Sequence, residues 1–260
     1  MTAGVRATTE HPGPLVTDES PFRERGPIED ARAEEILEQG ELEVLGRMPW
    51  SSNATFLTDV CLDGELVQGV YKPFRGERPL WDFPEGLYQR EVATYRLSRA
   101  LGWSLIPPTV FREGPMGVGS LQLFVPCDFE QHYFDYLGHE RYHHTLQRFC
   151  AFDVVANSTD RKGGHLVLDA QDRIWGIDNG LTFHSEFKLR TVIWDWAGDP
   201  IPSDIRDDVQ ALLERGLPDD LTDLLDSFEH DAVLTRARAL VREGHFPTDP
   251  TGRRFPWPLV

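Results

Sequence analysis

The chain has 260 residues, 40% hydrophobic and 11% aromatic, which is enough to bury a sizeable core in one domain or in two tightly packed lobes. Its formal charge of −17 repels DNA, RNA and anionic lipid surfaces, so the composition argues against a nucleic-acid-binding protein. Cys61, Cys127 and Cys150 are far apart in the chain and lie among apolar residues, so we expect them to be buried free thiols. The sequence contains no apolar run of roughly 20 residues and no signal-peptide pattern. We therefore expect a cytoplasmic protein without an integral membrane segment.

The first 26 residues are rich in Thr, Glu, Pro and Arg and contain few large apolar side chains. Such a segment cannot bury enough apolar surface to offset the entropy lost on ordering, so residues 1–26 are predicted to be a flexible tail. Helix-forming residues follow from Ile28 to Gln39, and Gly40 is a favourable position for a helix to end. A short helix is therefore expected at the start of the folded region.

The next segment changes to the alternation of a half-buried sheet. The Asp63-Gly64 pair predicts a tight hairpin turn between two of its strands. Between the first two strands lie Ser51, Ser52 and Asn53, a small polar turn whose backbone N–H groups could meet a phosphate. The alternating apolar-side positions are Leu42, Val44, Phe56, Thr58, Val60, Leu66 and Val70.

A helix is predicted over Leu87–Leu101, where apolar residues recur at helical spacing and Gly102 closes the run. Two more strands are expected at residues 109–111 and 120–125, around a turn at residues 113–117. The first half of the chain therefore predicts an antiparallel sheet with one helix packed near it.

The second half is mainly helical. The periodicity predicts a helix over residues 144–156, a short hairpin with strands at residues 166–168 and 174–177, and amphipathic helices between residues 203 and 244. We therefore predict an α+β, two-lobed fold. Its antiparallel-sheet N-lobe spans residues 27–125, and its helical C-lobe spans residues 126–260.

Polar clusters containing Asp160 and Asp178 stand at the two ends of that predicted hairpin. Phosphoryl transfer can use such a pair, because one carboxylate can orient the attacking group while the other holds a metal ion. The reaction also needs a cation on the phosphates and a second metal ligand. Lys72 and His165 are the candidates, and Glu91 on the following helix is placed to pair with Lys72.

These segments resemble the phosphatidylinositol 3-/4-kinase-like kinases, most closely the type II phosphatidylinositol 4-kinase branch and its bacterial and actinobacterial relatives. Residues 156–165 (ANSTDRKGGH) resemble the catalytic loop of that branch, and residues 177–183 (IDNGLTF) are similar to its metal-binding segment. Residues 51–56 (SSNATF) resemble its serine-containing phosphate loop, and residues 70–73 (VYKP) the segment with its nucleotide lysine. The similarity runs in order from about Leu42 to Phe246.

The resemblance implies a protein-kinase-like fold that binds ATP with Mg²⁺ or Mn²⁺. It implies that Asp160 is the catalytic-loop aspartate and that Asp178 binds the metal. Lys72 would contact the α- and β-phosphates, with Glu91 as its partner. The backbone of Leu123, Phe124 and Val125 would be the hinge that holds adenine.

One position departs from the family pattern. His165 stands where the family has an asparagine that binds a second magnesium ion. A neutral imidazole is a poorer ligand for Mg²⁺ than an amide oxygen and a better one for softer metals. The position of His165 therefore bears on both catalytic competence and metal preference.

Simpler interpretations exist for each residue taken alone. Asp160 and Asp178 could be turn residues, Lys72 could reach solvent from an edge strand, and Glu91 could lie on an exposed helix face. Three functions follow for the site: an ATP- and metal-dependent phosphotransferase, a nucleotide-binding pseudokinase without transfer activity, or a nucleotidyl transferase. The acidic charge favours a protein or small soluble hydroxyl acceptor over a lipid.

Overall fold

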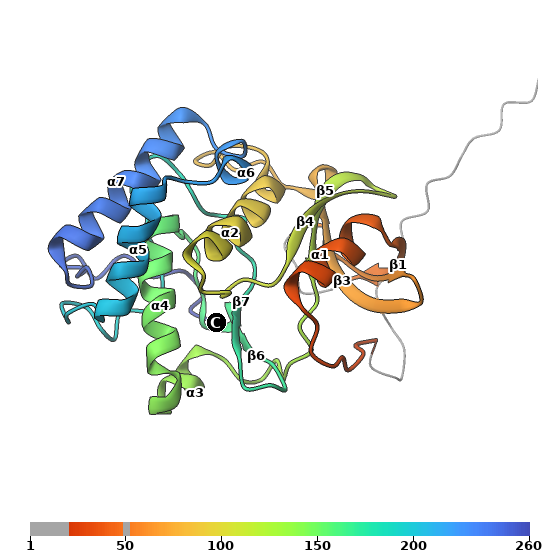
Figure 1. The fold of residues 1–260 in the computed structure, drawn as a ribbon, viewed down its shortest axis with the longest axis horizontal. Coiled ribbons are helices and arrows are strands. Elements are labelled where there is room, and N and C mark those ends of the chain that lie inside the picture. Colours follow the sequence, from red (N-terminus) through yellow and green to blue (C-terminus); the bar gives the residue numbers. More distant parts are fainter. Residues whose placement is uncertain (1–20, 49–52) are drawn as a thin grey trace, which may run out of the picture.

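The computed structural model describes residues 21–48 and 53–260. It has two lobes, one built on a five-stranded antiparallel sheet and the other made mainly of helices (Figure 1). The α+β, two-lobed architecture predicted from the sequence is therefore correct.

The sheet of the first lobe has the strand order β1-β2-β3-β5-β4, with each neighbouring pair antiparallel. The predicted turn between β2 and β3 is present: Asp63 has a φ of 53° and Gly64 a φ of 83°, as a tight hairpin turn requires. The strands are β1 (Glu41–Arg47), β2 (Phe56–Leu62), β3 (Glu65–Pro73), β4 (Thr109–Gly114) and β5 (Gly117–Leu123).

Two helices accompany this sheet. Helix α1 (Asp30–Gln39) ends at Gly40 as predicted, and its buried Ile36 and Leu37 pack on the sheet residues. Helix α2 (Leu87–Leu101) has the predicted bounds, and Gly102 closes it with a φ of 71°. Figure 1 shows α2 between the sheet and the helical lobe, so residues on α2 can reach both lobes.

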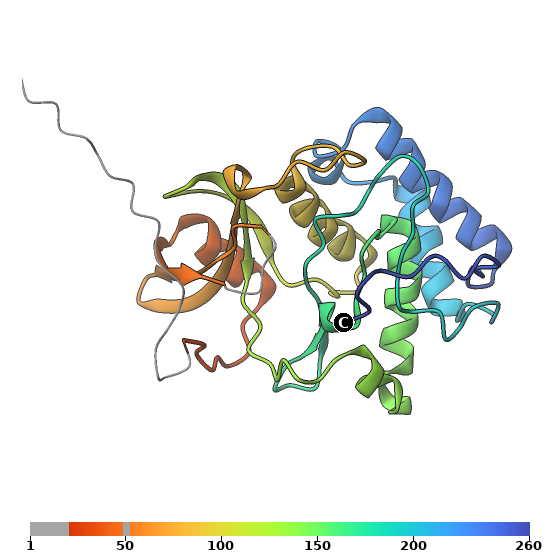
Figure 2. The same cartoon turned by 180° about the vertical axis from the view of Figure 1, so that it is seen from behind.

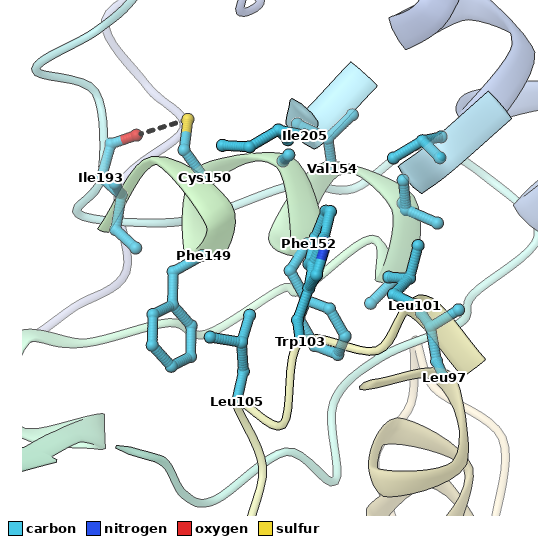
Figure 3. Packing of buried hydrophobic residues seen from close by; sticks show 14 of the residues in the cluster. Leu97, Leu101, Trp103, Leu105, Phe149, Cys150, Phe152, Val154, Ile193 and Ile205 are labelled. Carbon is cyan, nitrogen blue, oxygen red and sulfur yellow. Dashed lines mark hydrogen bonds between the residues drawn. The ribbon is translucent and has the colours of Figure 1, made fainter. Parts of the chain in front are cut away.

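The second lobe is organised around α4, which packs against α7, while α7 also packs against α5. Phe149 and Phe152 of α4 are fully buried, and Figure 3 shows them beside Leu105 and Trp103 of the chain that follows α2. This core therefore anchors the end of α2 to the helical lobe. The helices are α3 (Tyr133–Leu137), α4 (Glu140–Ala156), α5 (Ser203–Arg215), α6 (Asp219–Thr222) and α7 (Ser227–Glu243).

The short elements lie near the junction of the lobes. The predicted hairpin is present as β6 (Leu166–Leu168) and β7 (Ile174–Gly176), preceded by the 3₁₀ turn η2 (Gly163–His165). A second 3₁₀ turn, η1 (Phe74–Gly76), follows β3. The two ends of the β6–β7 hairpin therefore face the same part of the molecule.

The C-terminal segment returns to the β6–β7 region. The Gly163 N–H donates a hydrogen bond to the Leu259 carbonyl at 2.7 Å, and the Thr191 N–H donates one to the Arg254 carbonyl at 3.1 Å. Figure 2 shows this segment ending next to the turn before β6. Residues 254–259 therefore help to hold the loop that follows α4.

Several details differ from the sequence prediction. Helix α3 was not expected, and α4 begins at Glu140 rather than near His144, because its first turn is polar and lacks an apolar stripe. Strand β5 spans Gly117–Leu123 rather than residues 120–125. Cys61 is exposed and Cys127 is half-buried, whereas Cys150 is buried as expected. Among the described residues, no helix has both the length and the apolar character needed to cross a membrane.

Candidate functional site

Lys72 on β3 and Glu91 on α2 form an ion pair between Nζ and Oε1. Glu91 is only 3% exposed. Its second oxygen, Oε2, accepts a hydrogen bond of 3.0 Å from the backbone N–H of Asn179. A buried carboxylate needs such partners because desolvation of an unpaired charge is costly. The structure thus brings together the pair suggested by the sequence and joins it to the segment after β7.

Asp178 follows β7 and completes what we call the front cluster, which consists of Lys72, Glu91 and Asp178. Its φ of 56° is left-handed, a conformation that aspartate tolerates better than most residues. Its Oδ1 lies 2.9 Å from Lys72 Nζ, and its side chain is 60% exposed. The charge of Lys72 lowers the pKa of Asp178 below the ordinary aspartate value, so this carboxylate is ionised at neutral pH.

Lys72 is the only cation of the front cluster and is held by two carboxylates. Its desolvation favours the neutral amine, but Asp178 and Glu91 outweigh that effect and raise the pKa of Lys72. The ammonium group therefore stays charged, and it is fixed between residues from β3, α2 and the segment after β7.

Asp160 lies in the loop after α4, and its Oδ2 is 3.2 Å from Lys162 Nζ. Burial raises the pKa of Asp160, and Lys162 partly offsets this effect. Asp160 and Asp178 both line one small cavity, together with Ser158 and Asn179. The two aspartates at the ends of the hairpin are therefore brought to the same site.

His165 in η2 lies beside Asp178, with 3.5 Å between Nε2 and Asp178 Oδ2. Burial lowers the pKa of His165 to about 4, so its ring is neutral at physiological pH. Among residues 21–48 and 53–260, no cluster of three or more His, Cys, Asp or Glu side chains could hold a metal ion. A cation bound by Asp178 and His165 would therefore take its other ligands from a substrate or from water.

The predicted phosphate turn is described only in part. Ser51 and Ser52 lie outside the described residues. Asn53 Oδ1 accepts a hydrogen bond of 3.2 Å from the Arg78 N–H, and the Ala54 N–H donates one of 3.1 Å to the Gly76 carbonyl. The end of this turn therefore lies against the chain around η1, directly after the strand that carries Lys72.

Leu123, Phe124 and Val125 form the connection from β5 towards the helical lobe, and they are 3%, 5% and 6% exposed. The Phe124 N–H donates a hydrogen bond of 2.9 Å to the Gln68 carbonyl. The ring of Phe22 stacks on Phe124 with 4.9 Å between centroids. The prediction that residues 1–26 form a flexible tail is therefore wrong at Phe22. Its aromatic ring packs on an apolar residue of the connection between the lobes.

A buried group of charges, missed from the sequence, lies behind the site. Asp153 of α4 is fully buried, and its Oδ1 lies 3.0 Å from Nη2 of Arg161, which is 2% exposed. Arg161 Nη2 also donates a hydrogen bond of 2.9 Å to Asn179 Oδ1. Ser158 and Thr191 donate hydrogen bonds to Asp153 at 2.8 and 2.9 Å. We call Asp153, Arg161 and Asn179 the support network.

The support network fixes both segments that carry the candidate aspartates. Arg161 directly follows Asp160, and Asn179 directly follows Asp178. A sequence signal for it existed, since Asp153 stands on the apolar side of a predicted helix, where an unpaired charge would be costly. Its partner could not be identified, because Arg161 reaches it only through the tertiary fold.

Comparisons with solved structures show a protein-kinase-like fold. No family model matches the chain. A Golgi casein kinase crystallised with Mn and ADP has a TM-score of 0.58 at 15% identity, covering 89% of this chain and 80% of that one. Hydra Fam20, solved with sugar, has a TM-score of 0.53 at 11% identity and covers 88% and 91%. The Helicobacter pylori proinflammatory kinase CtkA has a TM-score of 0.50 at 7% identity and covers 81% and 94%.

A curated protein gives a much closer sequence match. Protein Rv2133c of Mycobacterium tuberculosis is 39% identical over 260 residues, covering 86% of this chain and 94% of that protein. Similarity at this level over nearly the full length of both proteins indicates common descent. The chain therefore belongs to the same family as Mycobacterium tuberculosis protein Rv2133c.

Proposed function

We propose that the protein is an ATP- and divalent-metal-dependent phosphotransferase acting on a hydroxyl group of a protein or a small soluble acceptor. The observation that carries the proposal is the position of Lys72. Its ammonium group forms ion pairs with both Glu91 and Asp178, and the three residues come from three different segments of the chain. Asp160 lines the same small cavity as Asp178. Further support comes from the kinase-like fold, which is shared with a kinase crystallised with Mn and ADP.

Lys72 supplies the positive charge for the phosphates of the nucleotide. Phosphoryl transfer depends mainly on positioning and on neutralising charge, so a cation in a fixed place is the main requirement. Glu91 provides that fixed place, because it is buried and is itself held by the Asn179 N–H. In this proposal the α- and β-phosphates bind at the exposed side of the front cluster, next to Asp178.

Asp160 accepts the proton of the acceptor hydroxyl. A carboxylate whose pKa is raised by burial is a stronger base than an ordinary aspartate, which favours this role. Lys162, at 3.2 Å from Asp160, places a second positive charge where the transferred group would pass. The acceptor would approach from the side of the loop that follows α4.

Asp178 and His165 are the residues that would hold the divalent cation. Magnesium in such sites takes one or two protein ligands and completes its shell with water and phosphate oxygens, which fits a site with only these two donors. The bound cation would neutralise negative charge on the phosphates. The neutral imidazole of His165 is a softer ligand than an amide oxygen, so Mn²⁺ is expected to serve better than Mg²⁺.

The finer assignments are part of the same proposal. Placement within the phosphatidylinositol 3-/4-kinase-like family rests on the four sequence segments that resemble it. Adenine is proposed to bind at Leu123, Phe124 and Val125, between an N-lobe of residues 27–125 and a C-lobe of residues 126–260. The net charge of −17 supports a protein or small-molecule acceptor over an anionic lipid surface.

The test is ATP turnover by the purified protein with Mg²⁺ and with Mn²⁺. Asp160→Asn is expected to reduce turnover by about 100-fold or more, as removal of a general base does. Asp231→Asn is the matched control, because the Asp231 side chain is 82% exposed on α7. Equal turnover by wild type and Asp160→Asn would show that Asp160 is not the base.

Two other outcomes separate the alternative functions. If an acceptor becomes labelled by α-labelled ATP but not by γ-labelled ATP, the protein transfers the nucleotidyl group. A rise in melting temperature with ATP and metal, without turnover, would indicate a nucleotide-binding pseudokinase, since a ligand that binds only the native state must stabilise it. The observation that favours this second candidate is His165, which lies 3.5 Å from Asp178 where the family that the sequence resembles has an asparagine.

A further inference from the structure

Arg90 directly precedes Glu91 on α2, and its guanidinium contacts the helical lobe. Nη2 forms an ion pair with Oε1 of Glu229, near the start of α7. Nη1 donates a hydrogen bond of 2.6 Å to the carbonyl of Thr182, in the segment that follows Asp178. The side chains of Arg90 and Glu229 are only 6% and 7% exposed. Water can therefore solvate neither charge well, and the two depend on each other.

Glu229 is a fixed anchor for this contact. Its Oε2 accepts a hydrogen bond of 3.1 Å from the Asp226 N–H at the cap of α7, and the Asp226 side chain accepts one of 2.8 Å from the Glu229 N–H. Helix α7 packs against α4 and α5. Arg90 is therefore tied to the core of the helical lobe.

Thr94, one helical turn after Arg90, forms a second link between α2 and the segment after β7. Its Oγ1 lies 3.1 Å from Thr182 Oγ1 and 3.4 Å from the Asn179 carbonyl. The Asn179 N–H in turn donates to Glu91 Oε2 at 3.0 Å. Positions i and i+4 are neighbours on a helix surface, so Arg90 and Thr94 hold the same face of α2.

A shift of α2 would separate Glu91 from Lys72, because the two residues come from different elements. The Arg90 ion pair opposes such a shift, since breaking it would leave two desolvated charges unpaired. An exposed ion pair has little such effect, because water can replace either partner. Arg99 on the same helix is of this kind, with a side chain that is 45% exposed. The two arginines should therefore differ in their effect on Glu91.

We propose that Arg90 is a positioning residue, which holds α2 at the place where Glu91 meets Lys72. It acts through Glu91 and is not itself a member of the front cluster. Its pairing with Glu229 makes the first turn of α7 part of the support for the candidate site. The inference rests on the proposed function for its meaning in catalysis, whereas the placement of Lys72 can be measured without ATP.

The experiment follows acetylation of lysine side chains in the full chain by acetic anhydride at about pH 8. The chain has three lysines, so mass spectrometry can report the rate at each one: Lys72, Lys162 and Lys188. Only the neutral amine reacts, and Lys72 should react slowly in wild type because its carboxylate partners raise its pKa. Lys162, on the loop after α4, is the internal reference.

Arg90→Gln is expected to raise the ratio of Lys72 to Lys162 acetylation rates at least about threefold, since a fall of one unit in the pKa of an amine raises its neutral fraction about tenfold. Arg99→Gln should leave the ratio unchanged. Val233→Ala, at a fully buried position of α7, controls for loss of stability alone. The proposal is wrong if Arg90→Gln gives a smaller rise, or if Val233→Ala raises the ratio as much.

A second variant decides the question if Arg90→Gln does not fold. Thr94→Val preserves Arg90 and the shape of the side chain but removes the second link, so the same ratio should rise at least about twofold. A smaller rise would overturn the proposal. Because acetylation needs no nucleotide, failure of the proposed function would appear only in the turnover assay, and failure of this inference only in the acetylation ratio.

Discussion

The front cluster and the support network meet at Asn179, and their carboxylates Asp178 and Asp153 differ in exposure. Asp178 of the front cluster has a side chain that is 60% exposed, whereas Asp153 and Arg161 of the support network are 0% and 2% exposed. Asn179 joins them, because its N–H donates to Glu91 and its side chain accepts from Arg161. A charge that meets a ligand must stay accessible, while a buried pair can hold a loop in one geometry only if every partner is present.

The largest effect is expected from breaking the support network. Asp153→Ala would leave the Arg161 guanidinium buried without its carboxylate, which typically costs about 3–5 kcal/mol of unfolding free energy. Urea denaturation followed by circular dichroism measures the loss. Asp231→Ala, at an exposed position, should change stability by less than about 0.5 kcal/mol. A loss below about 1 kcal/mol for Asp153→Ala would mean that the network does not support the fold.

The front cluster should show the reverse behaviour, with a large loss of activity and little change in stability. Asp178→Asn removes a charge whose side chain is largely exposed, so the unfolding free energy should change by less than about 1 kcal/mol. ATP turnover should fall by about 100-fold or more, as on removal of a preorganised charged group. Denaturation curves check the expected change in unfolding free energy, and turnover assays on the same preparations check the expected loss of activity. Strong destabilisation by Asp178→Asn would remove the contrast between the two groups.

A smaller effect is expected from one hydroxyl group beside the support network. Thr191→Val preserves the shape of the side chain but removes the hydroxyl that donates to Asp153 Oδ2 at 2.9 Å and accepts from the Ile193 N–H at 3.1 Å. Loss of these two buried bonds should lower the unfolding free energy measured by urea denaturation by about 1–3 kcal/mol. Thr235→Val, at an exposed position, is the control. If the two variants lose equal stability, the bond to Asp153 contributes nothing specific.

The smallest effect concerns the pH dependence of stability at Asp160. Its pKa is raised above the ordinary value of 3.8 by burial, so the native state binds the proton more tightly than the unfolded state. The stability contributed by this group therefore falls as pH rises from below 3.8 through the raised native pKa and is constant above it. Asp160→Asn should match wild type near pH 3 and be slightly more stable at pH 7. Denaturation curves at both values test the sign, and a variant less stable at pH 7 would contradict it.

Local sequence patterns predicted most secondary-structure elements, because each pattern has a cause within a few residues. Helix α2 has the predicted bounds from Leu87 to Leu101, since apolar spacing and Gly102 act locally. Helix α3 was missed because five residues are too few to show a helical period. Composition predicts a tail around Phe22, because the partner of this ring, Phe124, is about a hundred residues away in the chain.

The sequence by itself determined the α+β class, the order along the chain of most strands and helices, and the types of residue available for the site. Only the tertiary structure decided which charges meet. Lys72 and Asp178 are 106 residues apart, and the 2.9 Å between them depends on how the sheet and the helical lobe pack. The pairing of Asp153 with Arg161 was decided in the same way. The physical reason is that burial and partners set the free energy of a charged side chain, and both arise only when distant segments come together.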